Sequence, residues 1–137
     1  MKKIFLLSTL AVLTSFIQAQ NADYKVVFDM TSRDTVNNQT VVREANLIKE
    51  ANPDANIEVV VYSQGLDLVL KDKSTQAAAV EQLINDKKVS FKVCAMTMKR
   101  NNIDESQLLP GVEIVPDGIY EIISKQREGW GYIKVAH

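Results

Sequence analysis

The feature that most constrains the fold is the alternation of short β-branched runs with segments of helical periodicity. Runs typical of strands occupy residues 24–30, 57–63, 88–94, 112–115 and 131–135. Apolar residues recur at helical spacing between them, in residues 36–50 and again after Ser74 and Asp117, which can cap helices. Strands that alternate with helices at this spacing favour a parallel sheet covered on both faces. The pattern predicts one α/β domain, a three-layer sandwich with a five-stranded, mostly parallel sheet.

The first residues predict export. Lys2 and Lys3 precede a mostly apolar run, residues 4–17, and Ala19 offers a signal-peptidase cleavage site. This run is shorter than the roughly 20 residues that a membrane span needs, although an N-terminal membrane anchor is the alternative. We expect residues 1–19 to be a cleaved signal peptide and residues 20–137 to form a single periplasmic or secreted domain. The mature chain is then expected to contain no membrane span.

Composition excludes several classes of function. The formal net charge is −1, and loss of the two lysines in residues 1–19 makes it −3, so no basic surface favours nucleic acid. Cys94 is the single cysteine, which excludes an intramolecular disulfide. The single histidine, His137, is the last residue. We therefore predict no metal site and no cofactor.

Three loops follow the first three predicted strands: TSRDT (31–35), SQGLD (63–67) and CAMTM (94–98). Ligands of open parallel sheets bind at the carboxyl ends of strands, so these loops are the candidate site. The loop TSRDT could receive a phosphate, but it has no glycine for close backbone approach. It is better interpreted as a polar loop in which Asp34 or Thr35 caps the next helix.

Cys94 lies where the third predicted strand gives way to a short helix, residues 95–102. A thiolate at a helix start is stabilised by the helix dipole and by unpaired N–H groups, and Lys99 and Arg100 could add positive charge. A free cysteine is also one of the most often buried residues, so Cys94 could instead be a core residue. Without a Cys-x-x-Cys pair, a reactive Cys94 could carry a persulfide or form a mixed disulfide.

Several stretches resemble the DsrE/DsrF-like family of sulfur-relay proteins. They are the strand-end Cys94 followed by Thr97, the segments LLPGVEIVPDGIYEI and KQREGWGYIKV, the turn YSQGLDLVL, and Asn46 in the first helix. The resemblance implies an α/β sandwich related to the flavodoxin-like strand order, commonly assembled into trimers or hexamers. It also implies a cysteine that accepts and passes on sulfur as a persulfide. Met96 stands where many relatives have asparagine, and export is a second departure.

The leading hypothesis is therefore an exported DsrE-like protein that carries sulfur on Cys94 or binds a sulfur compound. Ser63, Gln64 and Gly65 are expected to line the same pocket, and Thr97 to donate a hydrogen bond to the sulfur. Expected partners are further copies of the chain, as a trimer or hexamer, and a protein that donates or accepts sulfur. The pocket should admit a small sulfur compound and exclude a second protein's thiol. The alternative is a non-catalytic binding or assembly module in which Cys94 is inert and buried.

Overall fold

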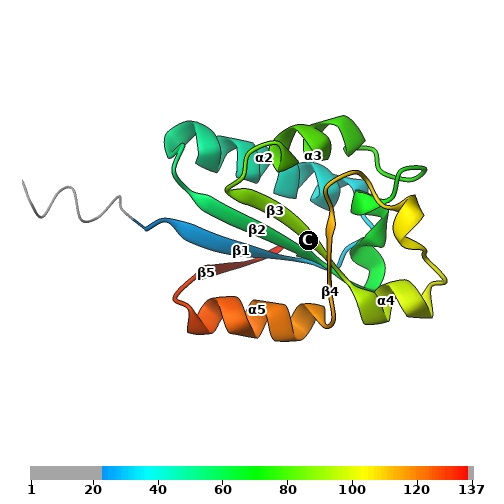
Figure 1. Ribbon diagram of the computed structural model, residues 1–137. Helices are drawn as coiled ribbons and strands as arrows, with labels where there is room; N and C mark the ends of the chain where they lie inside the picture. The colour runs from blue at the N-terminus through cyan, green and yellow to red at the C-terminus, as the bar shows by residue number, and fades with distance from the viewer. Residues whose placement is uncertain (1–22, 136–137) are drawn as a thin grey trace, which may run out of the picture.

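Five parallel strands form the sheet at the centre of the molecule, in the order β4-β3-β2-β1-β5 (Figure 1). The computed structural model describes residues 23–135, so the predicted signal peptide and His137 lie outside the described residues. The strands are β1 (Lys25–Met30), β2 (Asn56–Val61), β3 (Val89–Cys94), β4 (Glu113–Val115) and β5 (Gly131–Val135). The α-helices are α2 (Thr35–Ala51), α3 (Ala77–Ile84), α4 (Ala95–Arg100) and α5 (Gly118–Arg127). Two 3-10 helices, η1 (Ser63–Val69) and η2 (Glu105–Gln107), complete the elements.

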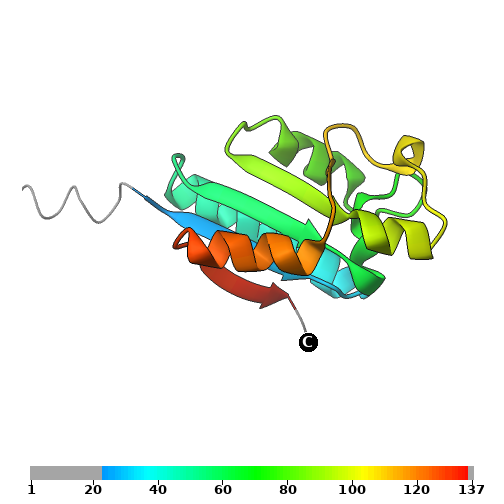
Figure 2. The same ribbon diagram turned by 60° about the horizontal axis from the view of Figure 1, so that its bottom comes forward.

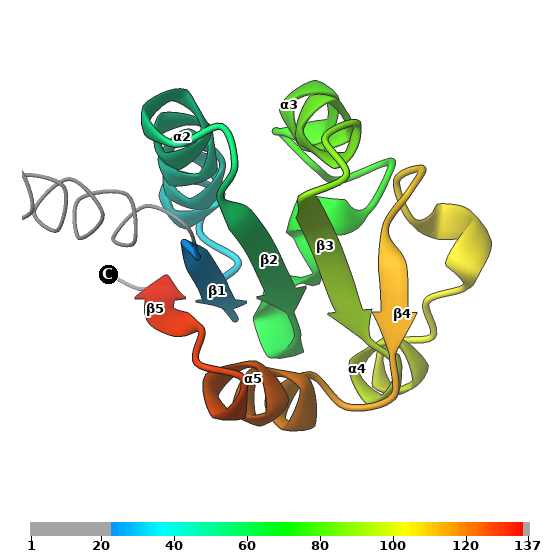
Figure 3. The ribbon, with the colours of Figure 1, turned by 60° about the vertical axis from the view of Figure 1, so that its left-hand side comes forward.

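The helices lie on both faces of the sheet, which confirms the predicted three-layer α/β class. Helices α2 and α3 cover one face, and α5 covers the other (Figure 3). Figure 2 shows α5 running along its face of the sheet. Helix α4 follows β3 directly, at the carboxyl end of the strands. No helix within residues 23–135 is long and apolar enough to cross a membrane.

The strand order departs from the flavodoxin-like order. In that order β1 lies between β2 and β3, whereas here β2 lies between β1 and β3. The reason is the path of the helices. Right-handed crossovers on one face move the chain in one direction, so α2 and α3 carry it stepwise from β1 to β3. Helix α5, on the opposite face, then returns it past β1 to the far edge, where β5 pairs with β1.

The helix ends follow local sequence signals. Asp34 caps α2 by accepting a hydrogen bond from the Val36 N–H, and Asp117 caps α5 by accepting from the two N–H groups that follow Gly118. Gly129 follows the end of α5 with a φ of +85°, as expected for a glycine stop. The predicted cap at Ser74 is wrong in detail. Its hydroxyl accepts from Gln76 N–H in the preceding turn, and α3 begins only at Ala77.

The two faces of the sheet are packed differently. The larger hydrophobic core lies under α2 and α3 and includes Phe28, Val59 and Phe91, all fully buried. Under α5 the buried apolar cluster comprises only Val27, Val60 and Ile122, with Tyr62 and Trp130 packed against it. Apolar burial therefore fixes α2 and α3 more firmly than α5.

Candidate functional site

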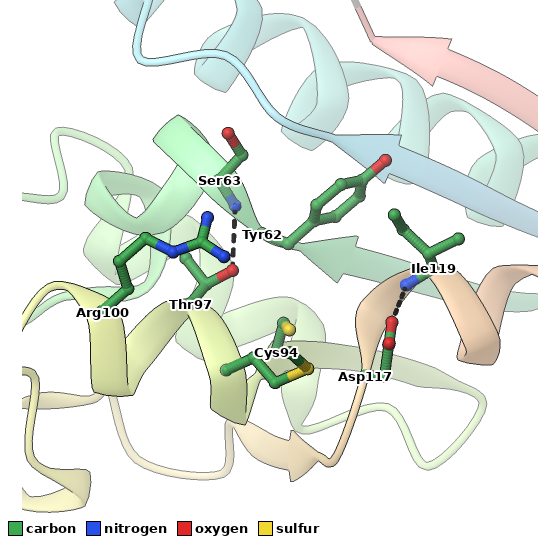
Figure 4. Close-up of a pocket in the computed structure, with 8 residues that line it drawn as sticks. Tyr62, Ser63, Cys94, Thr97, Arg100, Asp117 and Ile119 are labelled. Atoms are coloured by element: carbon green, nitrogen blue, oxygen red, sulfur yellow. Dashed lines mark hydrogen bonds between the residues drawn. The ribbon is translucent and has the colours of Figure 1, made fainter.

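A cavity of about 140 Å³ opens at the carboxyl ends of β2, β3 and β4. The connection after β2 leads to α3 on one face, while the connection after β4 leads to α5 on the other (Figure 3). Such a change of direction leaves a crevice between neighbouring strand ends. The cavity is lined by Tyr62, Ser63, Cys94, Met96, Thr97, Arg100, Asp117 and Ile119 (Figure 4).

Cys94 is the last residue of β3 and the N-cap of α4, and it is 5% exposed. The backbone N–H groups of Gly118, Thr97 and Met96 and the Thr97 hydroxyl act on its sulfur, and each of them lowers the pKa of the thiol. Burial alone would raise the pKa of the Cys94 thiol, but these donors favour the thiolate more strongly, so the pKa lies below its ordinary value. Burial and these donors thus act in opposite directions on the Cys94 thiol, and the donors outweigh burial.

Gly118 was not among the predicted site residues, and neither were the lining residues Tyr62, Asp117 and Ile119. A Cβ atom at Gly118 would lie 3.3 Å from Cys94 Cβ, 3.3 Å from Val60 Cγ1 and 3.4 Å from Tyr62 Cβ. Because glycine has no Cβ, the first turn of α5 can approach the end of β3 closely, and the Gly118 N–H lowers the pKa of the Cys94 thiol. The local signal was present in the sequence, since Asp117 marks a helix start and Gly118 is its first residue.

The loop after β2 is tied to the cysteine through one hydroxyl. Thr97 Oγ1 accepts a hydrogen bond of 3.2 Å from the Ser63 N–H (Figure 4), and the same hydroxyl lowers the pKa of the Cys94 thiol. Ser63 adopts a φ of 55°, a left-handed conformation that is uncommon for residues with a side chain. Ser63 is therefore held in an unfavourable conformation beside the candidate site, where such strain is often found.

We predict that Thr97→Val raises the pKa of the Cys94 thiol by about one unit, because valine keeps the shape but removes the hydroxyl donor. The change is measured as the pH dependence of iodoacetamide alkylation. Thr40→Val removes a hydroxyl that bonds only the Val36 carbonyl on α2, so it should leave the thiol unchanged. An unchanged profile in Thr97→Val would show that the hydroxyl does not stabilise the thiolate.

Of the predicted pocket residues, Ser63 and Thr97 lie with Cys94 in the cavity. Gln64 and Gly65 do not line it, which corrects the prediction for these two residues. Gln64 lines a neighbouring cavity of about 90 Å³. Gly65 packs on the backbone of β1, where an added Cβ would meet the Met30 carbonyl oxygen. In a 3-10 helix successive side chains point about a third of a turn apart, so adjacent residues cannot all face one cavity.

The rim of the cavity is partly apolar and carries one cation. Met96 and Ile119 are more than half exposed, whereas Met98 on the same helix is buried in the core. Arg100 lines the cavity and makes no ion pair within residues 23–135, while Lys99 is exposed outside it. Burial, with the nearby Asp29 carboxylate, raises the pKa of Tyr62 to about 12. The wall formed by Tyr62 is thus neutral at physiological pH. Two opposite charges line the cavity: the Arg100 guanidinium, which favours an anionic ligand, and the Asp117 carboxylate, which caps α5.

Comparison with known proteins supports the fold and the family. Residues 25–135 match the model of the DsrE/DsrF-like family. A protein of unknown function from Methanobacterium thermoautotrophicum, MTH1491, is 31% identical, with a TM-score of 0.77 over 82% of this chain and 99% of that one. The ychN protein of E. coli has the same fold at 15% identity, with a TM-score of 0.69 over 82% and 98% of the two chains. No curated protein matches the chain.

Proposed function

The chain belongs to the DsrE/DsrF-like family, and we propose that it carries sulfane sulfur as a persulfide on Cys94. The observation that carries this proposal is the setting of the thiol. The Cys94 thiol lines a cavity of about 140 Å³, and three backbone N–H groups and one hydroxyl lower its pKa. A thiolate stabilised in this way is the nucleophilic form of cysteine at neutral pH.

The proposed reaction is a transfer of one sulfur atom without net oxidation. The Cys94 thiolate attacks the terminal sulfur of an inorganic polysulfide or a low-molecular-weight persulfide. A new S–S bond forms at Cys94, the S–S bond of the donor breaks, and the donor leaves as a thiolate shortened by one sulfur. In the second half, a thiolate of the acceptor takes the outer sulfur and Cys94 leaves as thiolate. The lowered pKa of the Cys94 thiol increases the fraction present as thiolate, which is the form that attacks.

The size and the lining of the cavity suit a small, anionic sulfur donor. A water molecule occupies about 30 Å³ in the liquid, so a volume of about 140 Å³ accepts a few heavy atoms. Polysulfides and persulfides are anions at neutral pH, and Arg100 supplies a cation at the lining. The low exposure of Cys94 opposes contact with a second protein's thiol, which would protect it in an oxidising compartment.

Sulfur loading tests the proposal directly. The protein is purified without reductant, exposed to inorganic polysulfide, freed of excess reagent and weighed intact under denaturing conditions. We expect an added mass of one or more sulfur atoms that dithiothreitol removes, and none on Cys94→Ser. Wild-type protein that gains no sulfur, or Cys94→Ser that gains as much, would refute the carrier function.

The burial of Cys94 also favours the second candidate, a binding or assembly module with an inert thiol. The same preparation separates the two candidates. A carrier thiol is alkylated by iodoacetamide in the native protein and loads sulfur. An inert thiol is alkylated only after unfolding and loads none.

We further propose that the protein is exported and assembles into a trimer or hexamer. Export rests on the sequence of residues 1–19. Assembly is supported by large apolar side chains exposed on α5 and β5, namely Ile119, Tyr120, Ile123, Tyr132 and Ile133. Light scattering that reports a monomer at micromolar concentration would contradict assembly, and an uncleaved N-terminus in the host cell would contradict export.

A further inference from the structure

A buried group of charges lies between the sheet and α5, and the thiol chemistry proposed above does not use it. Glu58 in β2 is 2% exposed, and Lys92 in β3 and Glu121 in α5 lie beside it. Lys92 Nζ is 2.9 Å from Glu58 Oε2 and 2.8 Å from Glu121 Oε1. Lys125, one turn further along α5, is 3.7 Å from Glu58 Oε2. We call these four residues the Lys92 cluster.

The Lys92 cluster holds α5 through buried charges, which cost desolvation free energy. Taking charges out of water costs free energy that ion pairing only partly returns, so apolar side chains of similar size would hold α5 at least as well. The benefit of an ion pair is geometric, because a short contact between two charged groups fixes their relative position. The small apolar cluster under α5, formed by Val27, Val60 and Ile122, provides little such restraint.

The Lys92 cluster and the thiol share the same two elements. Lys92 and Cys94 are two residues apart on β3, so their side chains leave the same face of the strand. Gly118 and Glu121 are three residues apart on α5, so they lie on the same side of its first turn. The first turn of α5 therefore contacts β3 at two points, through Glu121 on Lys92 and through Gly118 on Cys94.

We propose that Lys92 and Glu121 are positioning residues for the thiol site: their ion pair holds the first turn of α5 against β3, so that the Gly118 N–H stays directed at the Cys94 sulfur. Neither residue lines the cavity or contacts the sulfur. The ion pair acts through the backbone of α5. This inference rests on Cys94 being the reactive thiol of the proposed function.

The direction in which the pKa of the Cys94 thiol shifts distinguishes a positioning role of Glu121 from a direct effect of its charge. Glu121 is negative, and a nearby negative charge disfavours a thiolate, so removing that charge should by itself lower the pKa of the Cys94 thiol. If Glu121 instead holds Gly118 in place, removing it weakens a hydrogen bond to the thiolate and the pKa rises. The two explanations thus predict opposite shifts for the same substitution.

The decisive variant is Glu121→Met, which keeps a long, helix-forming side chain and removes the charge. We expect the pKa of the Cys94 thiol to rise by about one unit, which corresponds to about tenfold slower alkylation by iodoacetamide at a pH below both pKa values. Above both pKa values the alkylation rate should equal that of wild type, because accessibility has not changed. A purely structural disturbance that opened the site would instead change this high-pH rate.

The matched control is Glu128→Met, which makes the same change at the other end of α5. Glu128 contacts Lys125 at 3.6 Å, is more than half exposed, and does not contact Lys92. We expect its thiol pKa to equal that of wild type. An unchanged or lowered thiol pKa in Glu121→Met, or an equal rise in Glu128→Met, would overturn the positioning role.

A second measurement follows the hydrogen bond itself. In wild type the amide proton resonance of Gly118 should shift as the Cys94 thiol titrates, and in Glu121→Met this shift should be smaller. Equal shifts in the two proteins would also overturn the proposal. Both measurements are made without any sulfur donor. A wild-type protein that titrates as described but loads no sulfur refutes the carrier function and leaves the positioning role established.

Discussion

Lys92→Met is expected to lower the free energy of unfolding by about 3 kcal/mol at pH 8, within the range found when one partner of a buried ion pair is removed. The variant leaves the Glu58 carboxylate in a site that is 2% exposed. Its Oε1 atom has no hydrogen-bond partner in the described part of the chain, and its Oε2 atom loses an ammonium group at 2.9 Å. The nearest remaining cation is Lys125, at 3.7 Å.

The loss of unfolding free energy in Lys92→Met should be smaller at pH 5 than at pH 8. Burial raises the pKa of Glu58 from 4.5 to about 7, against the hydrogen bond from Lys92, which lowers it. The folded protein therefore binds this proton more tightly than the unfolded chain, and the stability that Glu58 contributes falls as pH rises from about 4.5 to about 7. Without Lys92 the pKa of Glu58 rises further, so at pH 5 the carboxyl is neutral in the variant and needs no cation.

Urea unfolding at the two pH values measures this effect, with the fluorescence of Trp130, the single tryptophan, as the probe. The double variant Lys92→Met/Glu58→Met removes both charges and is the control. We expect it to recover most of the lost stability, because an apolar pair of similar volume replaces an ion pair at little cost. Lys92→Met as stable as wild type at pH 8, or a double variant less stable than Lys92→Met, would contradict this account.

Gly65→Ala is expected to be about as damaging, with a loss of about 3 kcal/mol in the free energy of unfolding. An added Cβ at Gly65 would overlap the Met30 carbonyl oxygen and lie 3.0 Å from its carbonyl carbon. Both atoms belong to the backbone of β1, so neither can rotate away, and η1 or the end of β1 must shift. Because η1 begins at Ser63, whose N–H bonds Thr97 Oγ1, the pKa of the Cys94 thiol should rise as well.

Thermal unfolding measures this second prediction, and the melting temperature should fall by roughly 10 °C. Gly131→Ala is the matched control, because its Cβ would meet the Lys25 carbonyl oxygen at 3.5 Å, an ordinary contact. That variant should change stability by no more than about 0.5 kcal/mol. Similar losses of stability in Gly65→Ala and Gly131→Ala would show that the close approach of Gly65 to β1 is not the reason why alanine destabilises the protein there.

The local elements were predictable because their signals are local. Each of the five strands overlaps its predicted run, and α2 and α5 begin at the predicted caps Asp34 and Asp117. The position of Cys94 at the end of a strand and the start of a helix follows from a change of periodicity within a few residues. The family was recognisable from the same stretches, and the match over residues 25–135 confirms it.

The candidate site was only partly predictable, because residues distant in sequence form it. Ser63 and Thr97 follow two adjacent strands and therefore meet beside Cys94, as expected of neighbouring loops in a parallel sheet. Gly118 in α5 lies close to Cys94 in β3, and this contact between a helix and a strand cannot be predicted from hydrophobic periodicity. Gln64 follows Ser63 directly yet lines another cavity, because the 3-10 geometry of η1 turns its side chain away.

The sequence by itself thus determined which segments are strands and helices, where α2 and α5 begin, and that the thiol lies at the carboxyl edge of the sheet. Hydrophobic spacing and capping residues act over a few residues, so they can be read without knowing the fold. Only the tertiary structure decided the strand order, the donors on the Cys94 sulfur and the partners of Glu58. These features depend on which face of the sheet each helix covers and on the register of the strands. The register places Lys92 opposite Val60, and the pleat directs its side chain toward α5, where it contacts Glu121.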